Sequence, residues 1–89
     1  MDIPDPVVDD MRQRLRRVEG QVRALQRMLD TKAEPRELAT QLSAATHALE
    51  QVGFRLLAAS VTYCVQHPVE AEANGYRIAD FERLFMKLS

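Results

Sequence analysis

The sequence predicts an all-α fold, in which a three-helix subunit has two long antiparallel helices and a short C-terminal helix. Apolar residues recur at alternating spacings of three and four along two long stretches, which is the repeat of a helix packed lengthwise on another helix. A polar turn, 31–34, separates the two stretches, and a shorter amphipathic stretch closes the chain. These observations predict one helical domain over residues 1–89.

Composition limits the classes of protein to consider. A chain of 89 residues buries only about 60–65% of its unfolded surface, so its stability is marginal and self-association is expected to help. Hydrophobic residues make up 46% and charged residues 28% of the chain, as in globular proteins. No apolar run approaches the roughly 20 residues of a membrane span, and the acidic N-terminus lacks the apolar core of a secretory signal. A cytoplasmic protein without membrane contact is expected.

The first helix is expected from Pro6 to about Asp30. Asp5 is its expected N-cap, because an N-cap residue followed by proline is a common helix start. Gly20 lies in mid-helix, where glycine costs about 1 kcal/mol relative to alanine. It indicates either the close approach of another backbone or a tolerated weak spot. The residues expected to form the buried seam are Val8, Met11, Leu15, Val18, Val22, Leu25 and Leu29.

The second helix is expected from Pro35 to His67, where Pro68 halts or kinks it. Its seam comprises Leu38, Leu42, Ala45, Leu49, Val52, Leu56, Ala59 and Tyr63. A second apolar row widens the surface of its C-terminal half and comprises Phe54, Leu57, Val61 and Cys64. One hairpin partner cannot cover both rows, so other subunits are expected to bury them.

After a loop with Asn74-Gly75 as turn residues, a short amphipathic third helix is expected. Its apolar positions are Ile78, Phe81, Leu84, Phe85 and Leu88.

Positive charge is concentrated in the first helix. Segment 11–28 carries six arginines against one glutamate, a local charge of +5 in a chain whose net charge is −1. Such a polarised surface is expected to meet a polyanion, namely a nucleic-acid backbone. The alternative is a solvated face that keeps an oligomer soluble. The residues expected to contact phosphate are Arg14, Arg16 and Arg17, supported by Arg12 and Arg23.

The sequence has no glycine-rich phosphate loop and no nucleophile elbow, and no motif ties His47 or His67 to a carboxylate or nucleophile. An enzyme is therefore not expected.

Three blocks resemble a known family: RLRRVEGQVRALQRMLD at 14–30, QLSAATHALEQV at 41–52 and DFERLFMKL at 80–88. They are similar to the copper-sensitive operon repressor family, the CsoR/RcnR/FrmR group of small bacterial regulators, over nearly the whole chain. The resemblance implies an all-helical homotetramer, built as a dimer of dimers without a helix-turn-helix. It also implies binding to operator DNA through the basic first helix, and release when an inducer binds.

The sensing positions implied by this resemblance are altered. Metal-sensing members carry a cysteine at the start of the second helix, and a histidine and a cysteine four residues apart near its end. Those positions fall on Pro35, Ser60 and Cys64. Proline has no ligating side chain and serine is a poor ligand for copper(I), so a family-type copper site is not expected. Persulfide-sensing and formaldehyde-sensing members also depend on the first cysteine, which Pro35 replaces.

Cys64 and His67 are the remaining candidates for sensing. Three residues apart on a helix, they would offer two ligands to zinc or a similar ion, with a third from another subunit; no other cofactor is expected. The alternative is that Cys64 is a small buried hydrophobe and His67 a cation favoured by the helix dipole. Thr46 stands where several members of the family carry an arginine as an additional DNA contact.

The sequence therefore predicts a DNA-binding repressor whose inducer is not family-type copper, with a thiol switch through Cys64 as one form of that hypothesis. The alternative is a helical scaffold or hetero-oligomer partner that has lost DNA binding or sensing.

Overall fold

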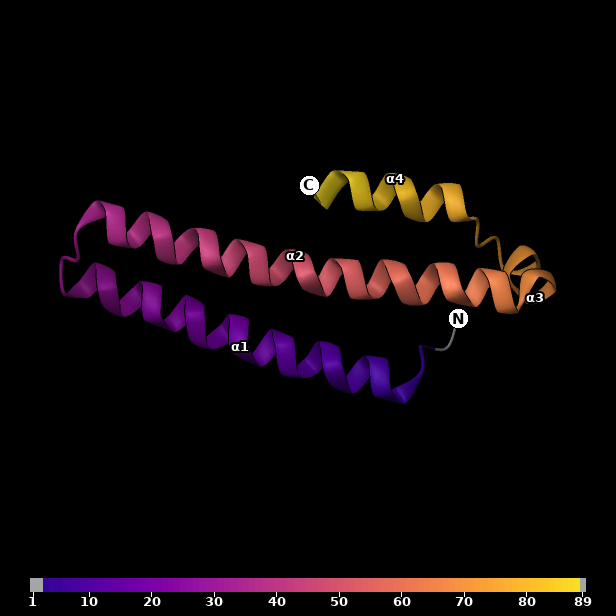
Figure 1. Cartoon of the computed structure of the whole chain (residues 1–89), viewed down its shortest axis with the longest axis horizontal. Helices are drawn as coiled ribbons and strands as arrows, with labels where there is room; N and C mark the ends of the chain where they lie inside the picture. The colour runs from indigo at the N-terminus through magenta and orange to yellow at the C-terminus, as the bar shows by residue number, and fades with distance from the viewer. Residues whose placement is uncertain (1–2, 89) are drawn as a thin grey trace.

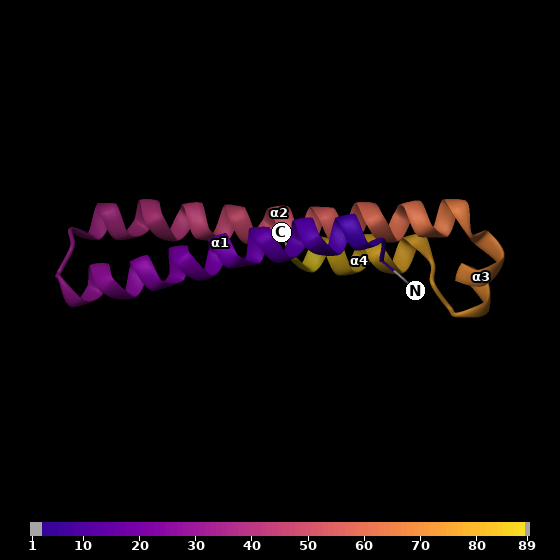
Figure 2. The same cartoon turned by 90° about the horizontal axis from the view of Figure 1, so that it is seen from below.

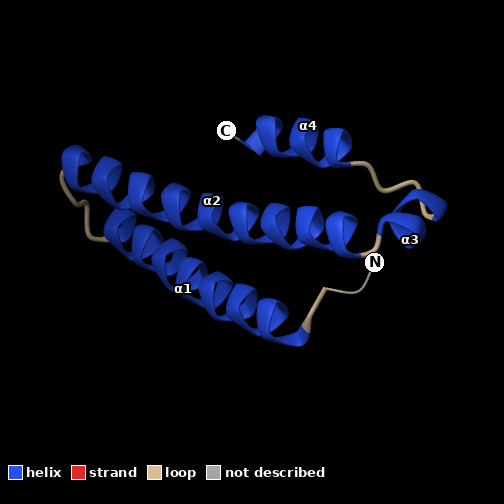
Figure 3. Cartoon of the chain, turned by 45° about the vertical axis from the view of Figure 1, so that its right-hand side comes forward, coloured by secondary structure: helices blue, strands red, loops and turns tan. Residues whose placement is uncertain are grey.

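The computed structural model describes residues 3–88. Within that range the chain forms four helices: α1 (Asp5–Asp30), α2 (Pro35–Gln66), α3 (Pro68–Ala73) and α4 (Ile78–Leu88). Helices α1 and α2 form a long antiparallel hairpin, and α4 folds back along the C-terminal half of α2 (Figure 1). Every regular element of the described chain is a helix (Figure 3). The all-α prediction with two long helices and a short C-terminal one is confirmed.

The start of α1 differs from the prediction by one residue. The helix begins at Asp5, and the carbonyl oxygen of Pro4 accepts hydrogen bonds from the amides of Val7 (2.9 Å) and Val8 (3.1 Å). No side chain caps this end. The N-cap role predicted for Asp5 is therefore wrong, because Asp5 already lies in the first turn. In the first turn, the negative charge of Asp5 still interacts favourably with the positive end of the helix dipole.

Two turns end their helices in the same way. Lys32 follows α1 with φ of 55°, and Gly75 follows α3 with φ of 75°. In each turn the next amide donates back to a carbonyl five residues earlier: Ala33 to Met28 at 2.9 Å, and Tyr76 to Ala71 at 2.8 Å. This left-handed cap satisfies carbonyls at the helix end, and glycine adopts it without steric cost.

The C-terminal end of α2 shows the effect of Pro68. The helix ends at Gln66, and His67 takes an extended φ of −130°, as expected for the residue before a proline. Pro68 then becomes the first residue of α3, a position that suits its missing N–H. The prediction of a loop directly after His67 is therefore wrong, because residues 68–73 form helix α3. Ala71, only 3% exposed, packs α3 against the end of α2.

Helix α4 covers part of the second apolar row of α2. Phe85 lies against Phe54 with ring centroids 4.7 Å apart, and Leu57 and Phe81 line a common apolar hollow between the two helices. The expectation that only other subunits bury this row is therefore wrong. The chain turns back after α3, which brings its own α4 onto the row.

The hairpin is a thin layer and leaves much apolar surface exposed. The principal extents of the chain are 55 × 25 × 14 Å, and in a view turned by 90° helix α4 lies behind the start of α1 (Figure 2). The buried seam predicted for α1 is wrong for the single subunit: no α1 residue is buried, four of the seven seam residues are half-buried, and Leu15, Val22 and Leu29 are 40–64% exposed. On α2, Leu42, Leu49 and Leu56 are 40–57% exposed.

No helix in residues 3–88 has the length and hydropathy to cross a membrane.

Gly20 is exposed on α1, and a Cβ built there would meet no atom within 4 Å. Within the described subunit no other backbone approaches this glycine.

Candidate nucleic-acid interface

The arginines of α1 divide into free and paired side chains. Arg12, Arg16 and Arg17 are exposed, and none of them lies within 4 Å of a carboxylate in the described subunit. Arg23 lies 3.9 Å from Glu19 one turn earlier, with both side chains about 70% exposed. An exposed pair of this kind contributes at most about 1 kcal/mol, so it does not hold Arg23 away from another anion.

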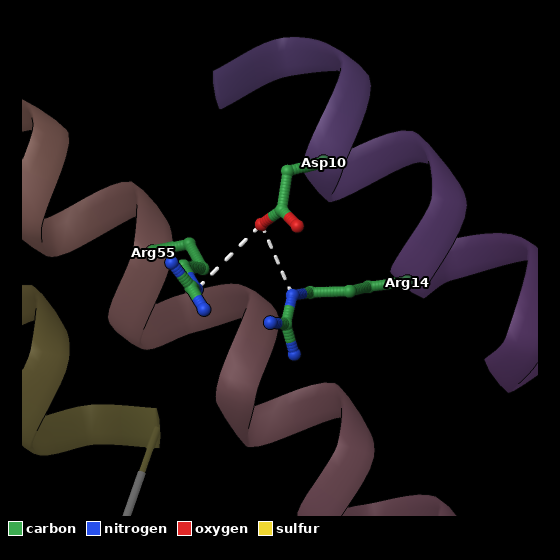
Figure 4. Close-up of polar contacts among 3 residues, drawn as sticks. All are labelled: Asp10, Arg14 and Arg55. Carbon is green, nitrogen blue, oxygen red and sulfur yellow. Dashed lines mark hydrogen bonds and ion pairs between the residues drawn. The ribbon is translucent and has the colours of Figure 1, made fainter. Parts of the chain in front are cut away.

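Arg14 has a different environment. Its Nε donates to Oδ2 of Asp10 at 3.0 Å, and its side chain is 27% exposed. The same Oδ2 lies 3.6 Å from Nε of Arg55 on α2, so one carboxylate joins arginines from both long helices (Figure 4). Arg14 thus faces the α1–α2 contact, whereas the other four predicted residues are exposed.

Sequence reasoning did not single out Arg55. It is the only formally charged side chain between Glu50 and Glu70, in an otherwise apolar or neutral stretch of α2. The absence of other charges around Arg55 in the sequence could have identified it, because a single arginine beside an apolar seam indicates an ion-pair partner or a function. The partner, Asp10, lies 45 residues earlier in the chain. Its identity follows only from the pairing of the two helices.

Arg14 and Arg55, which form the arginine cluster around Asp10, lie on one side of the α1–α2 contact. The exposed residues Leu15 and Leu56 lie on the opposite side. Successive residues of an α-helix are about 100° apart around its axis. Arg14 faces the contact and Leu15 lies about 100° further round α1, while Arg55 and Leu56 are separated by the same angle on α2, where Leu56 also lines the hollow against α4. Because Arg14 and Arg55 share the carboxylate of Asp10, they lie on one side. The two leucines therefore lie on the other.

Thr46 is exposed in the middle of α2. Its neighbour His47 is also exposed, with Nδ1 3.9 Å from a carboxylate oxygen of Glu50. Neither residue belongs to the arginine cluster.

Of the three positions that the resemblance assigns to sensing, Pro35 lies far from the other two, whereas Ser60 and Cys64 are about one turn apart on α2. Pro35 is the first residue of α2, and Ser60 lies 25 residues further along the same helix, which is roughly 37 Å of helix axis. The Ser60 hydroxyl is buried and donates to the carbonyl oxygen of Leu56 at 2.8 Å. The Cys64 thiol is buried, 4.0 Å from the carbonyl oxygen of Tyr76.

These side chains do not fit a family-type copper(I) site. Pro35 offers no donor atom, and the hydroxyl of Ser60 is a hard oxygen that is already hydrogen-bonded. Cys64 alone supplies a soft ligand. Among residues 3–88 no three histidine, cysteine or acidic side chains are grouped so that they could hold a metal ion.

Cys64 and His67 have different neighbours. Cys64 lies against the turn between α3 and α4, whereas the exposed His67 ring lies 5.0 Å from the ring of Tyr63. His67 also lies outside α2, as the residue after its last turn. The prediction that both residues lie on the second helix is therefore wrong for His67.

The family model and the curated relatives that match this chain describe the same kind of protein. The model of a family described as metal-sensitive transcriptional repressors matches residues 8–87. A copper-sensing transcriptional repressor of Mycobacterium tuberculosis, RicR, is 43% identical over 67 residues, which cover 75% of this chain and 70% of that protein. The copper-sensing transcriptional repressor CsoR of Bacillus subtilis is 28% identical over 81 residues, covering 91% of this chain and 80% of CsoR. No solved structure matches the chain.

Proposed function

Because the chain belongs to the family of metal-sensitive transcriptional repressors, which are not enzymes, we propose that it represses transcription by holding operator DNA on the arginines of α1. The observation that carries this proposal is the set of exposed guanidinium groups on one helix of a chain that is acidic elsewhere. Arg12, Arg16 and Arg17 have no carboxylate partner in the described subunit. Free guanidinium groups bind phosphate oxygens directly and release condensed counterions from DNA.

We also propose that the working form is a homotetramer, a dimer of dimers, in the cytoplasm. The subunit has a radius of gyration of 16.9 Å, compared with about 12 Å for a compact domain of its length. Its accessible surface of 6842 Å² exceeds the roughly 5,300 Å² of a compact monomer of this mass. Exposed leucines at seven-residue spacing, namely Leu42, Leu49 and Leu56, are typical of a helix that packs on another copy.

The proposed inducer is not copper(I) bound at the family-type positions. RicR and CsoR are copper-sensing proteins by name, but here Pro35 and Ser60 occupy two of the three positions that the resemblance assigns to ligands. A thiol reaction at Cys64 remains one form of the proposal. A metal held by Cys64 and His67 is less well supported, because their side chains have different neighbours.

Binding across a salt series tests the proposal. Fluorescence anisotropy should show that the protein binds a duplex from the region upstream of its own gene, with log affinity falling linearly with log salt concentration. Replacing Arg14, Arg16 and Arg17 together by alanine should weaken binding and flatten that slope by about 0.9 for each lost contact.

The matched control removes the same number of arginines outside α1, as Arg36→Ala, Arg77→Ala and Arg83→Ala combined. This control should keep a much steeper slope than the α1 variant. If the α1 variant remains assembled and retains the affinity and slope of the unaltered protein, the scaffold alternative is correct.

A further inference from the structure

Asp10 binds each of its two arginines through Nε, which leaves the terminal nitrogens of both available. The two Nε atoms lie 3.0 Å (Arg14) and 3.6 Å (Arg55) from the same oxygen, Oδ2. Figure 4 shows the terminal nitrogens of Arg14 pointing away from the carboxylate, and in Arg55 the dashed line to Asp10 likewise ends on Nε. Arg14 donates one hydrogen bond through Nε and Arg55 makes an ion pair, so both guanidinium groups, each with five N–H donors, keep donors for a second anion.

We propose that Arg55 of α2, together with Arg14, contacts the DNA phosphate backbone, and that Asp10 positions this pair. The inference rests on the proposed function and adds to it a residue outside the basic helix. The contact is to phosphate and not to a base edge, so Arg55 is expected to raise affinity for all duplexes to a similar extent.

The charge of the cluster supports this role. Two guanidinium groups and one carboxylate leave a net charge of +1, because Asp10 cannot neutralise both partners. The Arg55 side chain is 52% exposed, and it lines an open groove of about 600 Å³ between the start of α1 and the C-terminal half of α2. The Arg55 guanidinium group therefore remains accessible to an anion.

The position of the cluster also supports the proposal. Arg17 lies three residues after Arg14, so the two are neighbours on the surface of α1. Arg17 is exposed without a partner in the described subunit, and it extends the cluster outward from the hairpin. Leu42 and Leu49 share the helix face of Leu56 at seven-residue spacing, so the leucines that suit a second copy lie on the other side of the α1–α2 contact. Assembly through those leucines would therefore leave Arg14, Arg17 and Arg55 open to DNA.

The test compares Arg55→Ala with Arg55→Lys in the anisotropy salt series, on the assembled protein and with the upstream duplex and an unrelated duplex. Arg55→Ala should lower the affinity for both duplexes by roughly three- to tenfold and flatten the salt slope by up to about 0.9 per engaged subunit. Arg55→Lys should keep most of the slope because it keeps the charge. Arg83→Ala is the matched control, an arginine paired with a carboxylate of its own helix, Asp80, and should behave as the unaltered protein.

A second pair of variants covers the case in which Arg55→Ala does not fold. Asp10→Asn keeps an oxygen that accepts from Nε and removes the competing negative charge. It should steepen the salt slope more than Asp9→Asn, at a neighbouring exposed position that has no arginine partner within residues 3–88.

The outcomes separate the two proposals. If the unaltered protein binds DNA but Arg55→Ala lowers only the melting temperature and leaves the slope unchanged, the cluster is structural and this inference is wrong. Equal slopes for Asp10→Asn and Asp9→Asn lead to the same conclusion. If the unaltered protein binds neither duplex, the proposed function fails and this inference fails with it.

Discussion

The thiol of Cys64 lies 4.0 Å from the carbonyl oxygen of Tyr76, across the turn that joins α3 to α4. The contact ties the last turns of α2 to the segment that redirects the chain into α4. Cys64 is 8% exposed there, so a reagent or ion must displace part of this turn to reach the sulfur. A buried thiol of this kind behaves first as a small hydrophobe.

Copper(I) should accordingly bind no more tightly than it does to an ordinary thiol, because Pro35 and Ser60 offer no soft ligand. Competition with a copper(I) chelator should strip the metal from the unaltered protein and from Cys64→Ala alike. A stoichiometric, chelator-resistant complex that disappears in Cys64→Ala would mean that ligands from elsewhere in the assembly complete a site.

Assembly should depend on the exposed leucines of α2. Leu49 is 51% exposed in the subunit, and Leu49→Glu would place an unpaired charge in a buried interface. Sedimentation velocity should show a tetramer for the unaltered protein and smaller species for this variant. Ser43→Glu, at an exposed position on the same helix, is the control and should remain assembled. A stable monomer of the unaltered protein at micromolar concentration would contradict the prediction.

Arg14 and Arg16 should differ in their effect on stability. Arg14→Ala removes the ion pair between Arg14 and Asp10, in which the Arg14 side chain is 27% exposed. It should lower the free energy of unfolding by about 0.5–1 kcal/mol. Arg16 is exposed and unpaired in the described subunit, so Arg16→Ala should change it little. Urea denaturation measures both. Equal losses would show that the pairing of Arg14 with Asp10 adds no stability.

The two left-handed caps provide a matched pair of substitutions. Lys32→Gly should raise the melting temperature, because φ of 55° costs a residue with a side chain roughly 1 kcal/mol. Gly75→Ala should lower it for the same reason, at φ of 75°. Thermal unfolding followed by circular dichroism tests both. A lower melting temperature for Lys32→Gly would indicate that the lysine side chain makes a compensating contact in the assembly.

Much of the fold follows from local chemistry and could be predicted. Pro35 begins α2 and Pro68 prevents its continuation, because each acts through its own ring and missing N–H. The Asn74-Gly75 pair predicts a turn, and Gly75 adopts the positive φ that glycine tolerates there. The short α3 was missed because six residues give too little periodicity to separate a helix from a polar loop.

The candidate site could be predicted only in part. The sequence by itself determined the concentration of arginines on α1 and the absence of a soft ligand atom at Pro35 and Ser60, since charge and donor type belong to the residues themselves. Only the tertiary structure decided that Arg14 faces Asp10 and Arg55, and that Leu15 and Leu56 border the opposite side of the hairpin. The spacing of apolar residues shows that a helix has an apolar face, but not which residues of that face point directly at the neighbouring helix. The rotation of α1 against α2, which is set by packing, therefore decides which row is buried, which arginine is paired and which leucines remain exposed.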